Sequence, residues 1–131
     1  MELHAFTGLI TLMALGQYML FGILVGRARA KHSVPAPAIT GHPEFERMFR
    51  VQQNTLEQLI VFIPALWLFA AYISDFWGGL VGIMFIVGRE IYMMGYVKQA
   101  EKRSLGFGIT FGASAILWVG SLVGIVLHWI G

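Results

Sequence analysis

The stretch EFERMFRVQQNTLEQ, at 44–58, carries polar groups that could bind a small zwitterion. Arg50, Asn54 and Glu57 are spaced so that their side chains share one face of a helix. A guanidinium binds a carboxylate through two parallel hydrogen bonds, and a carboxylate such as that of Glu57 binds an ammonium group. The spacing therefore favours a ligand that carries both kinds of charge.

A second polar stripe lies further along the chain, in GREIYMMGYVKQAEKR at 88–103. Arg89, Tyr92 and Tyr96 share a helix face, and Arg103 follows seven residues after Tyr96 if the helix continues that far. The first stripe lies near the start of its helix and the second near the end of the next helix. Because neighbouring helices run antiparallel, we expect the two stripes to meet at one depth in the membrane. Together they carry surplus positive charge, which favours a ligand with more than one carboxylate.

A simpler interpretation is that Glu57 and Arg89 form a buried salt bridge that only fixes helix packing. An ionisable group in a membrane helix costs roughly 2.5–3.5 kcal/mol, so it usually faces protein or water. This bridge alone does not explain three further arginines expected near the same site, namely Arg29, Arg50 and Arg103. At this point the structural and the ligand-binding interpretations both stay open.

Several residues near the stripes also have ordinary explanations. Tyr92 and Tyr96 are compatible with an aromatic belt at the membrane surface. We expect the cations Arg47, Lys98 and Lys102 to contact water or lipid head groups.

The elements that position these residues follow from the composition. Of the 131 residues, 57% are hydrophobic and 12% are charged, which is typical of a membrane protein. Four apolar runs are long enough, or nearly so, to cross roughly 30 Å of hydrocarbon as helices. The sequence predicts a single all-α membrane domain over 1–131, a four-helix bundle with helices near 3–25, 46–73, 77–101 and 105–130.

The basic residues predict the orientation of this bundle. They occur in the first and third connections and at the start of the second helix, at Arg27, Arg29, Lys31, Arg47, Arg50, Lys98, Lys102 and Arg103. These connections lie on the same face of a four-helix chain. Because basic loops face the cytoplasm, we expect this face to be cytoplasmic and both termini to lie on the opposite side.

Other site chemistries find no support in the sequence. The chain has no cysteine, which excludes disulfides, thiolate metal sites and a cysteine nucleophile. The four histidines show no metal-ligand spacing, so we expect no metal. The stretch GFGITFG at 106–112 follows no strand and does not match GxGxxG. We expect neither a dinucleotide nor a nucleic-acid partner.

The two polar stretches resemble the MAPEG family, the membrane-associated proteins of eicosanoid and glutathione metabolism. The resemblance rests on PEFERMFRVQQNTLEQ at 43–58 and GREIYMMGYVKQAEKR at 88–103. It extends over all four predicted helices in order and length. The family includes microsomal glutathione transferases, leukotriene C4 synthase, prostaglandin E synthase and the non-enzymatic 5-lipoxygenase-activating protein.

The resemblance implies a homotrimer that holds glutathione between adjacent subunits near the cytosolic face. Motif matching gives Glu57 the γ-glutamyl ammonium and Arg50 a carboxylate, and it gives Arg103 the role of holding and activating the thiolate. The residues expected to bind glutathione are Arg29, Arg50, Gln52, Asn54, Glu57, Arg89, Tyr92 and Tyr96.

Two positions depart from the family pattern. Leukotriene C4 synthase has paired arginines at the end of its first helix, whereas Arg29 is followed here by Ala30. A family tyrosine after the second-helix glutamate is Gln58 here. Neither change removes the expected glutathione-binding set.

The function implied is a membrane-bound glutathione transferase, a glutathione-dependent peroxidase, or both. The thiolate would attack lipophilic electrophiles or lipid hydroperoxides that arrive from the membrane lipids. A non-catalytic lipid-binding scaffold, like the 5-lipoxygenase-activating protein, is the alternative. A purely structural four-helix protein would bind no glutathione at all.

Overall fold

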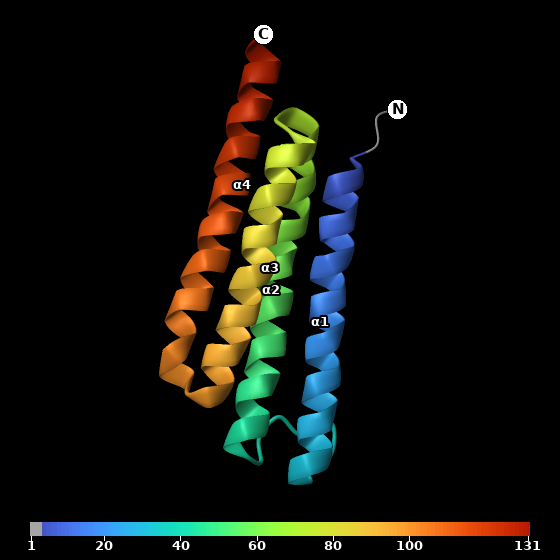
Figure 1. Ribbon diagram of the computed structural model, residues 1–131, viewed down its shortest axis with the longest axis vertical. Coiled ribbons are helices and arrows are strands. Elements are labelled where there is room, and N and C mark those ends of the chain that lie inside the picture. Colours follow the sequence, from blue (N-terminus) through green and yellow to red (C-terminus); the bar gives the residue numbers. More distant parts are fainter. Residues whose placement is uncertain (1–3) are drawn as a thin grey trace.

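The computed structural model describes residues 4–131 as four long antiparallel helices and one short 3-10 helix (Figure 1). This confirms the predicted all-helical fold. The predicted first residue of the first helix, at position 3, lies outside the described residues. The elements are α1 (Ala5–His32), α2 (Pro43–Tyr72), α3 (Asp75–Lys98), η1 (Ala100–Arg103) and α4 (Ser104–Ile130).

Helix boundaries differ from prediction at the basic end of the bundle. The first helix was predicted to end at 25, but α1 continues to His32, where Ser33 adopts a left-handed conformation with φ 55° and ends it. The second begins at Pro43 rather than at 46, because His42 caps it and proline suits a first helical turn. The third ends at Lys98 rather than at 101, where Gln99 is extended.

The helices are arranged with α2 and α3 in the middle and with α1 and α4 on either side of them (Figure 1). The loop after α1 and the turn through η1 lie at the same end of the bundle (Figure 1). This agrees with the prediction that both basic connections share one face. We call this end, which carries residues 27–50 and 96–104, the basic end.

The core forms two clusters along the bundle axis. One is centred on Phe62 and Phe85, whose rings stack with centroids 3.8 Å apart. The other lies toward the basic end and includes Phe21, Phe45 and Tyr92. The second cluster includes Tyr92, and Tyr96 packs against it, so packing there fixes the position of two of the side chains that the sequence singled out.

The surface of the bundle is that of a membrane protein. All four long helices are long and apolar enough to span a membrane. Trp77 and Trp129 are 61% and 84% exposed near the end opposite the basic end, where tryptophans anchor helices at the lipid surface. At that end Asp75 accepts hydrogen bonds from Thr7 N (2.9 Å) and Oγ1 (2.7 Å), which joins α1 to α3. The chain is therefore a multi-pass membrane protein.

Candidate functional site

Arg89 is the centre of the polar site, and its side chain is completely buried. Its Nη1 donates a 2.8 Å hydrogen bond to Oδ1 of Asn54 on α2. Its Cζ lies 4.1 Å from the centroid of the Tyr92 ring, within the range of a cation–π interaction. The two predicted stripes therefore do meet, through Asn54, Arg89 and Tyr92.

The simpler interpretation, a buried salt bridge between Glu57 and Arg89, does not hold in the structure. Among residues 4–131 Glu57 makes no ion pair, and its side chain is exposed on α2. Asn54 occupies the position on α2 that faces Arg89, and Glu57 lies about 60° further round the helix. Among the described residues, the Nε and Nη2 atoms of Arg89 have no hydrogen-bond partner. Arg89 is thus a buried cation held by an amide and an aromatic ring.

Arg103 reaches the site by a route that helix periodicity did not predict. The helix α3 does not continue to residue 103, because extended backbone at Gln99 and the 3-10 turn of η1 reverse the chain. The reversal brings the Arg103 Cζ to 5.4 Å from the Tyr96 ring centroid. Arg103 Nη1 also donates to the Ala100 carbonyl at 2.9 Å, and the side chain stays exposed. An accessible guanidinium at this position can contact a bound anion.

A cleft of about 410 Å³ joins these residues. Asn54, Tyr92 and Arg103 line it together with the start of α4, through Ser104, Phe107 and Gly108. Its size lies within the range of small-molecule sites. The cleft thus offers amide, phenol, hydroxyl and guanidinium groups against aromatic walls.

The cleft owes its shape to Gly106. A Cβ at this position would overlap the backbone N and Cα of Tyr92, so only glycine lets α4 approach α3 this closely. The close approach places Phe107 beside Tyr92, with ring centroids 6.4 Å apart. Gly106 was not identified from the sequence as a site residue, since its importance depends on where the two helices cross.

Six of the nine predicted residues do not line this cleft, and of these Arg89 and Tyr96 lie against the Tyr92 ring. Arg50 and Glu57 lie exposed on α2, on the stripe that includes Asn54. The Gln52 side chain points toward α1, where its amide nitrogen lies against Gly22. Arg29 Nη1 donates to the Ala38 carbonyl at 2.7 Å and to the Val34 carbonyl at 3.4 Å, and its Cζ lies 4.7 Å from the Phe45 ring centroid. The predicted set is therefore divided between two sides of α2.

The polar contacts of Arg47 and Gln17 were among those not predicted from the sequence. Arg47 was expected to contact water or lipid, but its Nε donates a 3.0 Å hydrogen bond to the Val97 carbonyl and joins α2 to α3. The Gln17 side-chain amide donates to the Ile86 carbonyl (2.9 Å) and to Glu90 Oε1 (3.1 Å), which joins α1 to α3. These hydrogen bonds join residues that are far apart in the sequence, so no sequence spacing could have predicted them. Within residues 4–131 no cluster of metal ligands is found.

Comparison with protein-family models matches the MAPEG family over residues 7–123. These bounds include all the residues of the polar site and most of the four helices.

Three proteins are similar to this chain over most of its length. Microsomal glutathione S-transferase 2 of Homo sapiens is 39% identical over 116 residues, which cover 88% of this chain and 79% of the relative. Leukotriene C4 synthase of Cavia porcellus is 31% identical over 121 residues, which cover 92% and 81%. A protein of Synechocystis, named only as uncharacterized protein sll1147, is 48% identical over 118 residues, which cover 90% and 86%.

Proposed function

Because the chain belongs to the MAPEG family, we propose that it is a membrane-bound glutathione transferase that activates the glutathione thiol for attack on lipophilic electrophiles. Reduction of lipid hydroperoxides by the same thiolate is a second activity of the proposed enzyme. The names of two relatives, a glutathione S-transferase and leukotriene C4 synthase, support this assignment. The observation that carries it is the cleft that Arg103 lines together with Tyr92 and Asn54.

Arg103 is the residue proposed to stabilise the thiolate. A free thiol has a pKa of about 8.5 and is only a few per cent ionised at neutral pH, and the thiolate is the nucleophile. Lowering the pKa of the bound thiol by about two units requires roughly 2.7 kcal/mol of preferential stabilisation of the anion. One guanidinium in a partly desolvated site supplies an interaction of this size. The protein needs no cysteine, because the substrate brings the sulfur.

The remaining residues bind the peptide part of glutathione. Arg50 binds a carboxylate and Glu57 binds the γ-glutamyl ammonium, both from the exposed stripe of α2. Asn54 and Tyr92 bind within the cleft, and Arg89 positions both of them through its hydrogen bond and its contact with the ring. The further binding groups are Arg29, Gln52 and Tyr96.

The division of these residues between two sides of α2 supports a site shared by two subunits. Gln52 faces α1, whereas Asn54 faces α3 and α4. One copy of the chain cannot surround a ligand with both. An exposed carboxylate and an exposed guanidinium on a membrane helix also favour burial against another copy, since polar groups facing lipid are costly. We assign the protein as a homotrimer with glutathione between adjacent subunits, at the cytoplasmic face.

The second substrate reaches the thiolate from the lipid. An apolar groove of about 290 Å³ runs between α2 and α4, and its lining includes Gln58, Phe111 and Trp118. Phe111 lies one helical turn beyond Phe107 of the cleft, so the groove continues toward the thiolate. In conjugation the sulfur forms a bond to an electrophilic carbon and the leaving group departs. In peroxide reduction the sulfur attacks the terminal peroxide oxygen, the O–O bond breaks, the alcohol leaves and a sulfenic acid forms. A second glutathione thiol then attacks this sulfur, which gives the disulfide and releases water.

The test is the ultraviolet absorbance of the thiolate when glutathione is added to the detergent-solubilised protein near neutral pH. We expect a thiolate signal in the wild type and in Lys102→Ala, which removes a neighbouring exposed cation, and its loss in Arg103→Ala. Glu57→Gln is expected to weaken glutathione binding in calorimetry without lowering the thermal midpoint. Binding without a thiolate signal in the wild type would overturn the role of Arg103. Failure to bind glutathione would make the non-catalytic lipid scaffold the better assignment.

A further inference from the structure

A second cleft lies at the basic end between α1 and α3, and it holds none of the residues assigned to glutathione. Its volume is about 390 Å³. Its floor is apolar, and two cations and one carboxylate stand at its rim. The lining residues are Leu24, Ala28, Met48, Met93 and Val97 in the floor, with Arg27, Lys31 and Glu44 at the rim.

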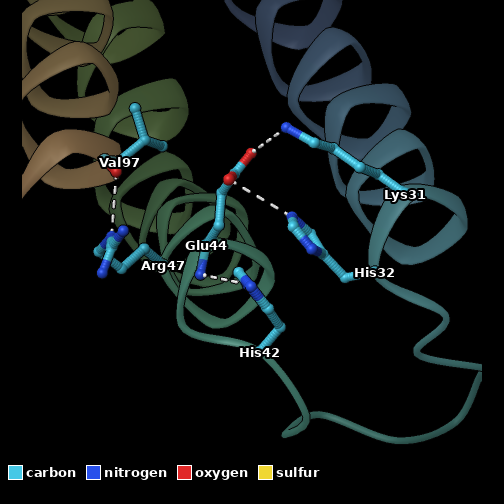
Figure 2. A network of polar contacts seen from close by, with 6 residues as sticks. All are labelled: Lys31, His32, His42, Glu44, Arg47 and Val97. Atoms are coloured by element: carbon cyan, nitrogen blue, oxygen red, sulfur yellow. Dashed lines mark hydrogen bonds and ion pairs between the residues drawn. The ribbon is translucent and has the colours of Figure 1, made fainter.

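The charge at the rim of this cleft is positive. Lys31 Nζ lies 3.2 Å from one oxygen of Glu44, and His32 Nε2 lies 3.4 Å from the other, so the carboxylate is already engaged (Figure 2). Arg47 is held beside the cleft by its hydrogen bond to the Val97 carbonyl, on the other side of Glu44 from Lys31 (Figure 2). Among the described residues, Arg27 is exposed and makes no ion pair.

The length of α1 places this rim at the depth of lipid head groups. Its 28 residues span about 42 Å, which exceeds the roughly 30 Å of the hydrocarbon core. About 20 residues from Ala5 reach the end of that core near Val25, and Arg27 follows directly. The floor residue Leu24 then lies beside acyl chains, and Lys31 lies in the head-group layer.

We propose that this cleft binds one anionic phospholipid from the surrounding leaflet. The lipid phosphate contacts Arg27 and Lys31, and an acyl chain lies along Leu24, Met48 and Met93. Basic pockets between membrane helices bind anionic head groups in this way. A zwitterionic lipid binds this cleft more weakly, because the cation of its head group is repelled by the surplus positive charge at the rim. A soluble anion gains nothing from the apolar floor.

This site is distinct from the glutathione cleft. The two clefts share no lining residue, and Glu44 and Met48 approach this one from a different side of α2 than Asn54. Lipid binding can therefore be measured in the absence of glutathione, and the result does not depend on the function proposed above.

The experiment compares spin-labelled phosphatidylglycerol with spin-labelled phosphatidylcholine in phosphatidylcholine bilayers that contain the full-length protein. The motionally restricted fraction gives the association constant of each lipid. We expect the wild type to prefer phosphatidylglycerol and Arg27→Gln to lower that preference about fivefold, the factor that corresponds to about 1 kcal/mol per cation. Lys102→Gln, an exposed cation outside the cleft, is the matched control and should leave the preference unchanged.

A second variant tests the apolar floor while keeping every charge. Leu24→Trp fills the cleft and should also reduce restricted phosphatidylglycerol, with helical circular dichroism like that of the wild type. An equal loss in Lys102→Gln would show a general surface attraction and overturn the site. The absence of any preference in the wild type would also overturn it. Displacement of the lipid by inorganic phosphate at constant ionic strength would assign the rim to a free anion instead.

Discussion

Substituting Gly106 by alanine tests whether the contact between α3 and α4 builds the cleft proposed for glutathione. The new Cβ would overlap the backbone N and Cα of Tyr92. Favourable carbon contacts begin near 3.5 Å, so the two helices must separate by about 1 Å at this point. Overpacking of this kind costs about 1–3 kcal/mol. The same shift moves Arg103, three residues earlier, relative to Tyr92.

A misplacement of about 1 Å at a reacting group can reduce the rate about 100-fold. We therefore expect Gly106→Ala to lose the thiolate absorbance and about 100-fold in conjugation rate with a soluble aryl halide. Its thermal midpoint should also fall. The assay needs only purified protein, glutathione and a chromogenic electrophile, so thiolate formation and turnover are read on one sample.

Gly112→Ala is the matched control for this prediction. It lies on the same helix, and a Cβ there meets nothing within 4 Å. Alanine also favours a helix over glycine by roughly 0.8–1.0 kcal/mol. We expect its activity to be unchanged and its thermal midpoint to be equal or higher. Equal activity in Gly106→Ala and Gly112→Ala would refute the argument that this backbone contact shapes the site.

Three further variants test other contacts. Asn54→Ala removes the hydrogen-bond acceptor of the buried Arg89 and should lower the free energy of unfolding by about 1.5–3 kcal/mol in a reversible unfolding assay. An unchanged free energy would mean that another group accepts a hydrogen bond from the guanidinium. Asp75→Ala removes the acceptor of both Thr7 hydrogen bonds and should cost at least about 1 kcal/mol in the same assay; a normal midpoint would contradict the joining of α1 to α3 at that end. Arg29→Gln removes the hydrogen bond to the Ala38 carbonyl, so protease cleavage in the loop after α1 should become faster while the helix content stays the same. Unchanged cleavage would show that other contacts hold this loop.

Helix periodicity accounts for the expected meeting of the two polar stripes, which the structure shows. Residues three or four apart must share a face, so Arg89 and Tyr92 had to lie together, and Asn54 met them from α2. Periodicity does not decide which of two polar residues a turn apart faces the neighbouring helix. The sequence therefore left open a pairing of Arg89 with Glu57, whereas the partner in the structure is Asn54. That choice depends on how the two helices are rotated, which only packing determines.

Hydropathy predicted where the membrane ends better than where the helices end. The apolar run stops near residue 25, but α1 continues to His32. Arginine, lysine and alanine are good helix formers, so the helix extends past the hydrocarbon into the head-group layer. The opposite error occurs at Gln99, where a chain reversal ends α3 before the predicted residue 101. The contact between Arg103 and Tyr96 was thus expected, but through a longer helix that does not form.

The position of Gly106 at the start of the last helix has a consequence for the synthesis of the protein. The first three helices can enter the membrane as they emerge from the ribosome and already contain Asn54, Arg89 and Tyr92. The wall of the cleft made by Ser104 and Phe107 is still missing at that stage. The cleft closes only when α4 is inserted and packs against α3. A growing or truncated chain therefore lacks the complete cleft proposed for glutathione until its last helix is in place.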